Sequence, residues 1–292
     1  MVATSSSEWF LYGNYLSIGI SQYGTFGTYN SCTSSICTWG WTSILGLRQD
    51  HDGWGQGDSP GTGDFFLPGT KYYMWCIGYR TTENGSFTYL CNDRKSNSQQ
   101  MTGVTITDAS DSSEKIAGVT MQWSNSVIQV DSTYSFHACS KKILISAKIT
   151  NLGSGTMYDP SYLIGLDPDN DKEAGGSYST INSIQGQKSQ GDDYTSVCAE
   201  GSSSGISLCM SSTHPRSYGY RGLSFSDNPL NNEPGDSLQS SGGSATTEDK
   251  ALALVTYGSN SLAQNEQSEN IGMYFGLGAV DDVKLPNVEK CT

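Results

Sequence analysis

The sequence predicts an all-β fold: a large antiparallel β-sandwich, stapled by disulfides and carrying long loops. Short segments rich in aromatic and β-branched residues recur along the 292 residues, separated by clusters of Gly, Asn, Ser and Pro. No stretch of the sequence shows the sustained i, i+3, i+4, i+7 apolar spacing of an amphipathic helix. No repeat with a period of about 20–50 residues is present, which argues against a propeller or a solenoid.

Alternating apolar residues bounded by turn signals predict the strands of the first half of the chain. These strands are Trp9–Tyr12, Tyr15–Ile20, Tyr23–Asn30, Tyr72–Tyr79, Gly85–Leu90, Gly103–Thr107, Ile116–Trp123, Val127–Val130 and Tyr134–Ala138. Two hairpins are expected among them, with turns at Gly13-Asn14 and at Glu83-Asn84-Gly85.

In the second half, Lys142–Thr150 is the clearest predicted strand because apolar and more polar residues alternate along it. Its core-facing residues would be Ile143, Ile145, Ala147 and Ile149. Further strand signals lie at Tyr158–Leu166, Ser179–Gln185, Tyr194–Met210, Ala251–Tyr257 and Asn270–Leu277. Asp227–Glu248 is rich in Asn, Pro, Gly and Ser and predicts a long surface loop. Because only two strands follow this loop, we expect one domain over residues 1–292.

Composition narrows the classes of function. The chain carries 16 Lys and Arg residues against 29 Asp and Glu residues, a formal net charge of −13. Nucleic acids and anionic membranes are bound through basic patches, so neither is expected as a partner. No apolar run approaches the ~20 residues of a membrane span, so no membrane insertion is expected. The 34 Gly and 17 Tyr residues are typical of a folded extracellular β-protein.

Eight cysteines without a Cys-x-x-Cys pair favour disulfides, which imply an oxidising compartment and a secreted or cell-surface protein. Local strand order favours the pairs Cys32–Cys37, Cys76–Cys91 and Cys198–Cys209, which leaves Cys139–Cys291 as the fourth pair. The only Asn-x-Ser/Thr acceptor is Asn84, at a predicted hairpin tip where a glycan can be accommodated.

The first residues lack the basic and apolar regions of a leader, so we expect a mature chain whose leader has been removed or replaced by a start Met.

Two acidic loops predict a Ca²⁺ site, because Ca²⁺ takes oxygen ligands and relieves the repulsion between close carboxylates. The candidate ligands are Asp50, Asp52 and Asp58 in a glycine-rich loop, and Asp167, Asp169 and Asp171 in a second loop. Lys172 and Tyr178 stand where an EF-hand needs Gly and Glu, so an EF-hand is excluded. The alternative interpretation is that both loops are solvated acidic turns.

Aromatic residues beside polar groups are typical of sugar-binding sites, because rings stack on pyranoses while polar groups bind the hydroxyls. Trp54, Tyr218 and Tyr220 are the candidate ligand-binding residues. The alternative is that such residues are core or loop anchors.

An enzyme is the competing hypothesis. A polysaccharide-active hydrolase could use two loop carboxylates, and a lyase could use His214 or Tyr218 as its base. The sequence has three histidines and no Gly-x-Ser-x-Gly motif, and it singles out no pair of catalytic carboxylates. We therefore expect binding without turnover and assign no catalytic residue.

Several stretches also carry a resemblance to known proteins. They are Tyr15–Ile20, Ile143–Asn151, Tyr162–Asp169, Asn265–Ser268 and Ile271–Gly276. In this order they resemble large β-sandwich modules of secreted and cell-surface proteins, including adhesin-like proteins. The resemblance implies a fold and a location, since such modules share no single activity.

The sequence as a whole predicts a secreted or cell-surface structural or adhesive module, stabilised by Ca²⁺. Its expected partner is a glycan, a matrix polysaccharide or a second copy of the chain. Self-assembly is included because few charges stand on the predicted strands, which leaves sheet edges open to pairing.

Overall fold

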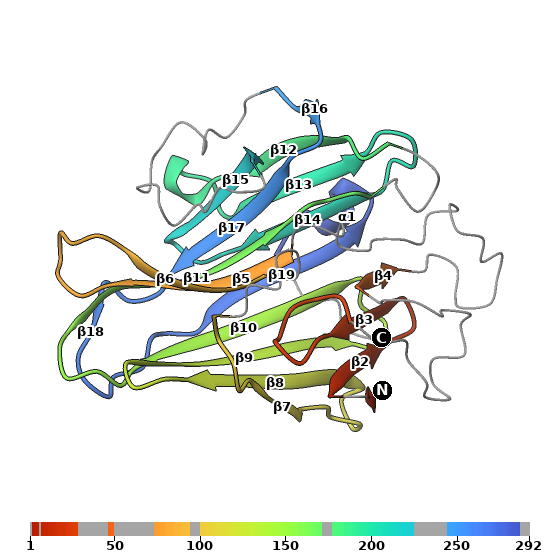
Figure 1. Ribbon diagram of the computed structural model, residues 1–292. Helices are drawn as coiled ribbons and strands as arrows, with labels where there is room; N and C mark the ends of the chain where they lie inside the picture. Colours follow the sequence, from red (N-terminus) through yellow and green to blue (C-terminus); the bar gives the residue numbers. More distant parts are fainter. Residues whose placement is uncertain are drawn as a thin grey trace.

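The computed structural model describes residues 2–5, 7–28, 46–49, 73–93, 100–170, 177–224 and 244–286. The fold is all-β, and its antiparallel sheets form a sandwich (Figure 1). Within these residues, the one α-helix is the short α1 (Val280–Val283), and a 3₁₀ turn covers Lys188–Gln190. No helix in this part of the chain has the length and apolar character of a membrane span.

The largest sheet has nine strands in the order β16-β12-β13-β14-β19-β10-β9-β8-β7. Their bounds are β7 Thr105–Asp108, β8 Ile116–Ser124, β9 Ile128–His137, β10 Lys142–Asn151, β12 Thr180–Gly186, β13 Thr195–Gly201, β14 Ser207–Ser212, β16 Thr246–Glu248 and β19 Ile271–Gly278. Strand β10 lies between β9 and β19. The predicted alternation along β10 is confirmed: all four expected core residues, Ile143, Ile145, Ala147 and Ile149, are fully buried.

The second sheet has the order β15-β17-β11-β5-β6, and β18 pairs separately with β11. Its strands are β5 Tyr73–Arg80, β6 Thr88–Asp93, β11 Met157–Leu166, β15 Ser217–Leu223, β17 Ala251–Tyr257 and β18 Ser261–Leu262. The hairpin predicted around Asn84 is confirmed as β5 and β6, which pair antiparallel. Strand β11 lies between β5 and β17, and this position sets where the chain leaves the sheet at Asp167.

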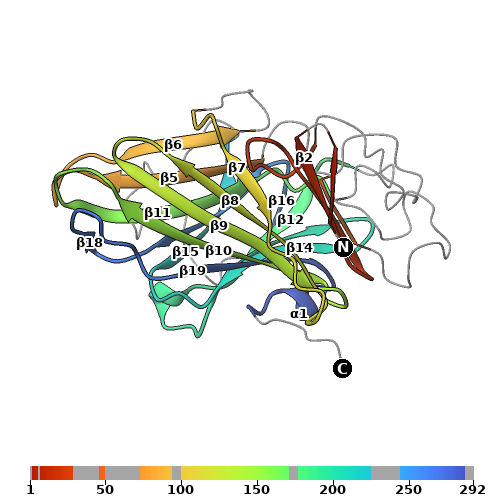
Figure 2. The ribbon, with the colours of Figure 1, turned by 90° about the horizontal axis from the view of Figure 1, so that it is seen from below.

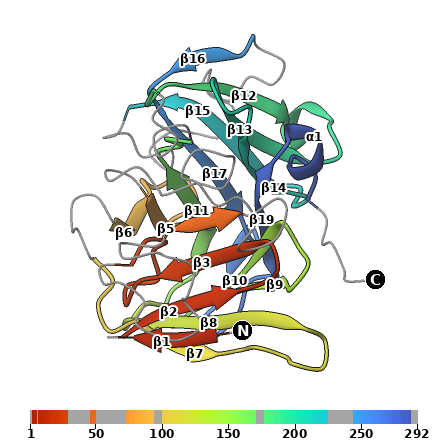
Figure 3. The same ribbon diagram turned by 90° about the vertical axis from the view of Figure 1, so that its right-hand side faces the viewer.

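A four-stranded sheet is formed by β1 (Val2–Ser5), β2 (Glu8–Tyr12), β3 (Leu16–Ile20) and β4 (Leu47–Gln49). The predicted hairpin at the start of the chain is confirmed as β2 and β3. Figure 3 shows this sheet beside the end of the nine-stranded sheet that carries β7 and β8, and β2 contacts β8 there.

One hydrophobic core joins all three sheets. It includes Ile18 of β3, Ile164 of β11 and Ile143 of β10, all with less than 2% of their surface exposed. Between the two larger sheets (Figure 2), the hydroxyls of Tyr134 in β9 and Tyr162 in β11 lie 3.4 Å apart. Apolar residues from every sheet therefore leave water together, which is the main favourable term in folding.

Two predicted disulfides are confirmed. Cys76 and Cys91 lie directly opposite each other in β5 and β6, and their bond is 2.06 Å long. Cys198 and Cys209 are opposite in β13 and β14, with a bond of 2.04 Å. Cys139 is also disulfide-bonded. Cys32, Cys37 and Cys291 lie outside the described residues, so the pairs Cys32–Cys37 and Cys139–Cys291 stay predictions. The two bonds indicate an oxidising environment.

The expected strand Tyr23–Asn30 is wrong over its described part. Residues 21–24 form a turn closed by a hydrogen bond from Gly24 N to Ser21 O of 2.9 Å. Gly24 has φ of 77°, a left-handed conformation that glycine adopts without strain. Phe26 makes only an isolated bridge to Ile20.

Three strand assignments also differ from the prediction. The segments expected separately at Val127–Val130 and Tyr134–Ala138 form the single strand β9, because its pairing with β8 and β10 is continuous across the polar residues between them. Strand β15 was not among the predicted strands, and it forms because β17 supplies a pairing partner for it. Strand β16 occupies the end of the predicted loop Asp227–Glu248, where it pairs with β12. Residues 225–243 of that loop lie outside the described part.

Candidate metal centre

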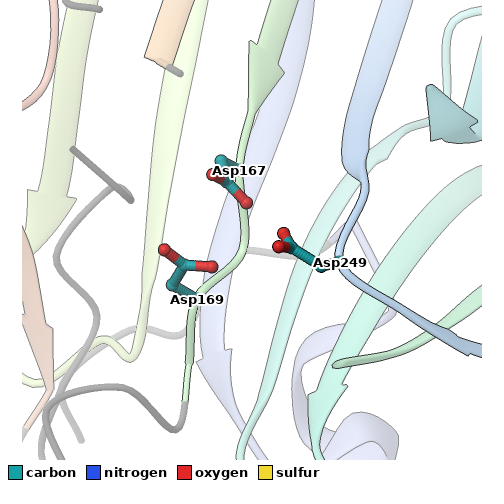
Figure 4. Close-up of side chains that lie close together, drawn as sticks. All are labelled: Asp167, Asp169 and Asp249. Atoms are coloured by element: carbon teal, nitrogen blue, oxygen red, sulfur yellow. The ribbon is translucent and has the colours of Figure 1, made fainter. Parts of the chain in front are cut away.

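Three carboxylates converge at one end of the second sheet. Asp167 and Asp169 follow β11, and Asp249 precedes β17. One carboxylate oxygen from each residue lies within 4.8 Å of the other two. Figure 4 shows the three side chains gathered where the two chain segments run side by side. The structure thus brings together an acidic triad that could hold a metal ion.

Strand pairing explains why these residues meet. Strands β11 and β17 are antiparallel, and Leu166 is the partner of Leu252. Continuing this register past the end of β11 places Asp169 opposite Asp249. Side chains two residues apart in an extended chain point to the same side, which brings Asp167 to the same place.

The surroundings of the triad are mostly buried. Asp167 is 4% exposed and Asp169 is 8% exposed, whereas Asp249 is exposed. The next residue, Asn170, is only 2% exposed, and its Nδ2 donates hydrogen bonds to Ala199 O (2.8 Å) and Ile206 O (3.0 Å). These bonds fasten the acidic segment to the β13–β14 hairpin. Two buried carboxylates repel each other unless a cation or a proton lies between them.

The side-chain amide of Asn170, the residue that follows Asp169, is buried. Asn170 Oδ1 is buried and has no hydrogen-bond partner among the described residues. Both amide hydrogens are used in the bonds to Ala199 O and Ile206 O, so the side chain is held against the β13–β14 hairpin. The triad itself offers carboxylate oxygens, which are ligands suited to hard cations.

The predicted metal ligands have different outcomes. The structure brings Asp167 and Asp169 together, as the second acidic loop predicts. Sequence reasoning missed Asp249, because the signal that identifies it is the register between β11 and β17. The other predicted ligands, Asp50, Asp52, Asp58 and Asp171, lie outside the described residues and stay predictions.

Of the predicted ligand-binding aromatics, the structure describes Tyr218 and Tyr220, and neither is exposed. Tyr220 is fully buried among apolar residues of the second sheet, so its ring has no face to offer a sugar. Tyr218 is half-buried and meets the ring of Tyr257 edge-on, with the ring centroids 5.7 Å apart. Trp54 lies outside the part of the chain that the structure describes.

His214 belongs to a turn that leads into β15. Its Nδ1 accepts a hydrogen bond from Arg216 N (3.2 Å), and its Nε2 lies 3.2 Å from Glu269 Oε1. Burial lowers the pKa of His214, although Glu269 partly opposes this effect. Its backbone oxygen also accepts a bond from the Ser217 hydroxyl (2.7 Å). These contacts account for His214 as a structural residue.

Asn84 lies in the exposed turn between β5 and β6. The turn is closed by a hydrogen bond from Gly85 N to Thr82 O of 3.0 Å. The site is accessible to a glycan, and its modification stays a prediction.

Comparison with known proteins shows similarity at the level of structure. No protein-family model and no curated protein matches the chain. A bacterial glucoamylase complexed with acarbose aligns with a TM-score of 0.51 and 8% identity, over 94% of this chain and 33% of the glucoamylase. A GH36 α-galactosidase from Geobacillus stearothermophilus aligns with a TM-score of 0.41 and 9% identity, over 97% of this chain and 41% of that one.

A galactose mutarotase related enzyme from Lactobacillus acidophilus aligns over 95% of this chain and all of its own, with a TM-score of 0.35 and 9% identity. Of these three, the glucoamylase is similar enough to support the fold. This chain spans about a third of that glucoamylase. At 8% identity the likeness concerns the fold alone.

Proposed function

We propose that this chain is an extracellular β-sandwich module that binds Ca²⁺ at the triad of Asp167, Asp169 and Asp249, and that it binds glycans without turning them over. The convergence of three carboxylate oxygens within 4.8 Å of one another carries the metal part of this proposal. Burial of two of the three carboxylates supports it, because a cation held between close carboxylates offsets their mutual repulsion.

The chemistry of the ligand set favours Ca²⁺. Ca²⁺ takes six to eight oxygen ligands in flexible geometry and accepts carboxylates and amide oxygens alike. The triad supplies carboxylate oxygens, and the exposed Asp249 leaves one side open to water. Zn²⁺ prefers nitrogen and sulfur ligands, and neither His nor Cys belongs to the described cluster.

The glycan part of the proposal rests on fold similarity and on composition. The glucoamylase whose fold resembles this chain is described in complex with acarbose. The negative net charge disfavours polyanionic partners, while the hydroxyl-rich composition suits contact with neutral sugars. We also propose that the chain forms a single domain, which the shared core of the three sheets supports.

The enzyme hypothesis is less well supported by the described residues. A glycosidase needs two carboxylates on either side of a sugar, but Asp167 and Asp169 are both buried. His214 is held by Arg216 and Glu269, and Tyr218 packs against Tyr257. Binding to a second copy of the chain remains a separate candidate, because β7 and β16 are edge strands of the nine-stranded sheet.

Two measurements test the proposal. Melting temperatures in EDTA and in excess Ca²⁺ test the metal site, because a ligand that binds only the folded state raises the melting temperature. Glycan binding, measured beside an assay for released reducing ends and unsaturated uronates, separates a binding module from an enzyme. Sustained product release would contradict the binding function. Size analysis across a salt series would reveal self-assembly.

A further inference from the structure

A cleft of about 410 Å³ lies where the four-stranded sheet meets the β7 edge of the nine-stranded sheet. Trp9 of β2, Gln22 and Tyr23 of the turn after β3, and Ile106 of β7 contribute to its lining. Figure 3 shows β1 and β2 at the same end of the molecule as β7 and β8. The volume falls within the range of about 300–1,000 Å³ that is usual for small-molecule sites.

The lining combines an apolar surface with a polar rim. Trp9, Val104 and Ile106 are half-buried and pack against the main core, whereas Gln22 and Ser7 are exposed. Neither the indole N–H of Trp9 nor the side-chain amide of Gln22 makes a hydrogen bond to any residue that the structure describes. The cleft therefore presents an aromatic ring beside hydrogen-bonding groups that a ligand can use.

The two walls of the cleft are held by the same buried side chain. Asn92 is fully buried, and its Nδ2 donates to Tyr23 O (3.0 Å) in one wall. The same Nδ2 donates to Met101 O (3.0 Å), and Met101 N donates back to Asn92 Oδ1 (2.8 Å), just before Gly103 and Val104 in the other wall. Trp75 Nε1 also donates to Tyr23 O (3.0 Å). Such fixed walls lower the entropy cost of binding a ligand.

The absence of charge on the described lining residues indicates which class of ligand fits the cleft. Ser7, Trp9, Gln22, Tyr23, Gly103, Val104 and Ile106 are the described lining residues, and none of them carries a charge at neutral pH. An anionic ligand would find no cation among them and would also meet a protein with a net charge of −13. A neutral ligand with one apolar face and many hydroxyls fits this lining best.

We propose that this cleft binds a neutral oligosaccharide, with one pyranose stacked on Trp9 and its hydroxyls bonded to Gln22 and Ser7. This inference rests on the proposed glycan-binding function and names a site for it. It places the sugar away from Tyr218 and Tyr220, which the sequence favoured, and assigns the binding to residues that the sequence did not single out.

The test is a glycan array of neutral and acidic oligosaccharides probed with the full chain, followed by calorimetric titration with a neutral glycan that binds. Replacing Trp9 by Ala should weaken binding about tenfold, as expected for loss of a stacking ring. The exposed Gln22 allows a second variant that cannot disturb the core. Gln22→Ala should weaken binding about threefold to tenfold, with an unchanged melting temperature.

Controls separate this cleft from other surfaces. Tyr89→Ala removes a 37% exposed aromatic residue of β6 and should leave affinity unchanged. If Tyr218→Ala abolishes binding while Trp9→Ala and Gln22→Ala do not, the cleft is the wrong site and the glycan-binding function stands. Trp9-dependent binding of acidic glycans only would overturn the neutral class. If no glycan on the array binds, the cleft proposal and the glycan part of the proposed function both fail.

Discussion

Replacing Asp169 by Asn tests whether the triad is a metal site or an ordinary acidic turn. The buried Asp167 and Asp169 offer carboxylate oxygens within 4.8 Å of each other. At an effective dielectric constant of ~20, two charges at that separation repel by about 3 kcal/mol. The contribution of Asp249 is smaller because that residue is exposed. Without metal, the Asn variant should therefore be more stable than the wild type.

The assay compares melting temperatures of both proteins in EDTA and in excess Ca²⁺. In the wild type, Ca²⁺ at about 100 times its dissociation constant should add ~2.7 kcal/mol. For a domain of 292 residues that corresponds to roughly 4–5 °C. Asp169→Asn should raise the melting temperature in EDTA and remove most of the Ca²⁺ response. Opposite shifts under the two conditions are the signature of a cation that neutralises the triad.

Two further variants make this test specific. Asp249→Asn removes the exposed ligand and should weaken the Ca²⁺ response without disturbing buried contacts. Asp193→Asn changes an exposed carboxylate outside the triad and should leave both melting temperatures unchanged. If Asp169→Asn lowers the melting temperature equally in EDTA and in Ca²⁺, Asp169 serves a hydrogen-bonding role and the metal interpretation is refuted.

Two more predictions concern stability. Replacing Cys198 and Cys209 together by Ala removes a disulfide that joins residues 11 positions apart in the sequence. The free energy of unfolding, measured by urea titration, should fall by about 2–4 kcal/mol. An unchanged free energy of unfolding would contradict this prediction. Burial lowers the pKa of His214 in the folded protein, and Glu269 partly opposes this shift. As pH falls below about 6.5, His214 therefore binds a proton more readily in the unfolded chain than in the folded protein, and folding stability is lost. His214→Gln should reduce the loss of melting temperature between about pH 7 and pH 5, and an identical loss in both proteins would argue against it.

Local patterns predicted those strands whose two faces differ. Strand β10 was recognisable because every second residue, from Ile143 to Ile149, faces the core while its neighbours are more exposed. The cysteine pair Cys76–Cys91 followed from a hairpin with a clear turn. Strand β15 was missed because Ser217–Leu223 contains small and aromatic residues without simple alternation, and β17 provides the pairing that makes it a strand.

The sites depend on contacts that no local pattern encodes. Asp167 and Asp169 were identifiable as a pair of close carboxylates, but Asp249 joins them through a strand register between distant segments. The cleft is likewise assembled from separate stretches, with Trp9 in β2 and Ile106 in β7. Such a site becomes visible only when the packing of one sheet against another is known.

The metal centre and the cleft are built from different elements, which lets their roles be separated. The triad joins the ends of β11 and β17, whereas the cleft lies between β2 and β7. Asp167 and Asp169 are buried, so Ca²⁺ there would act on stability and would not bind the sugar directly. At a temperature where the metal-free protein is still folded, EDTA should leave the affinity for a neutral glycan within about twofold. The reason is that none of the three triad residues is among the described residues that line the cleft. A tenfold loss of affinity under those conditions would mean that the ion shapes the binding site, and the sugar would then have to be sought at the triad.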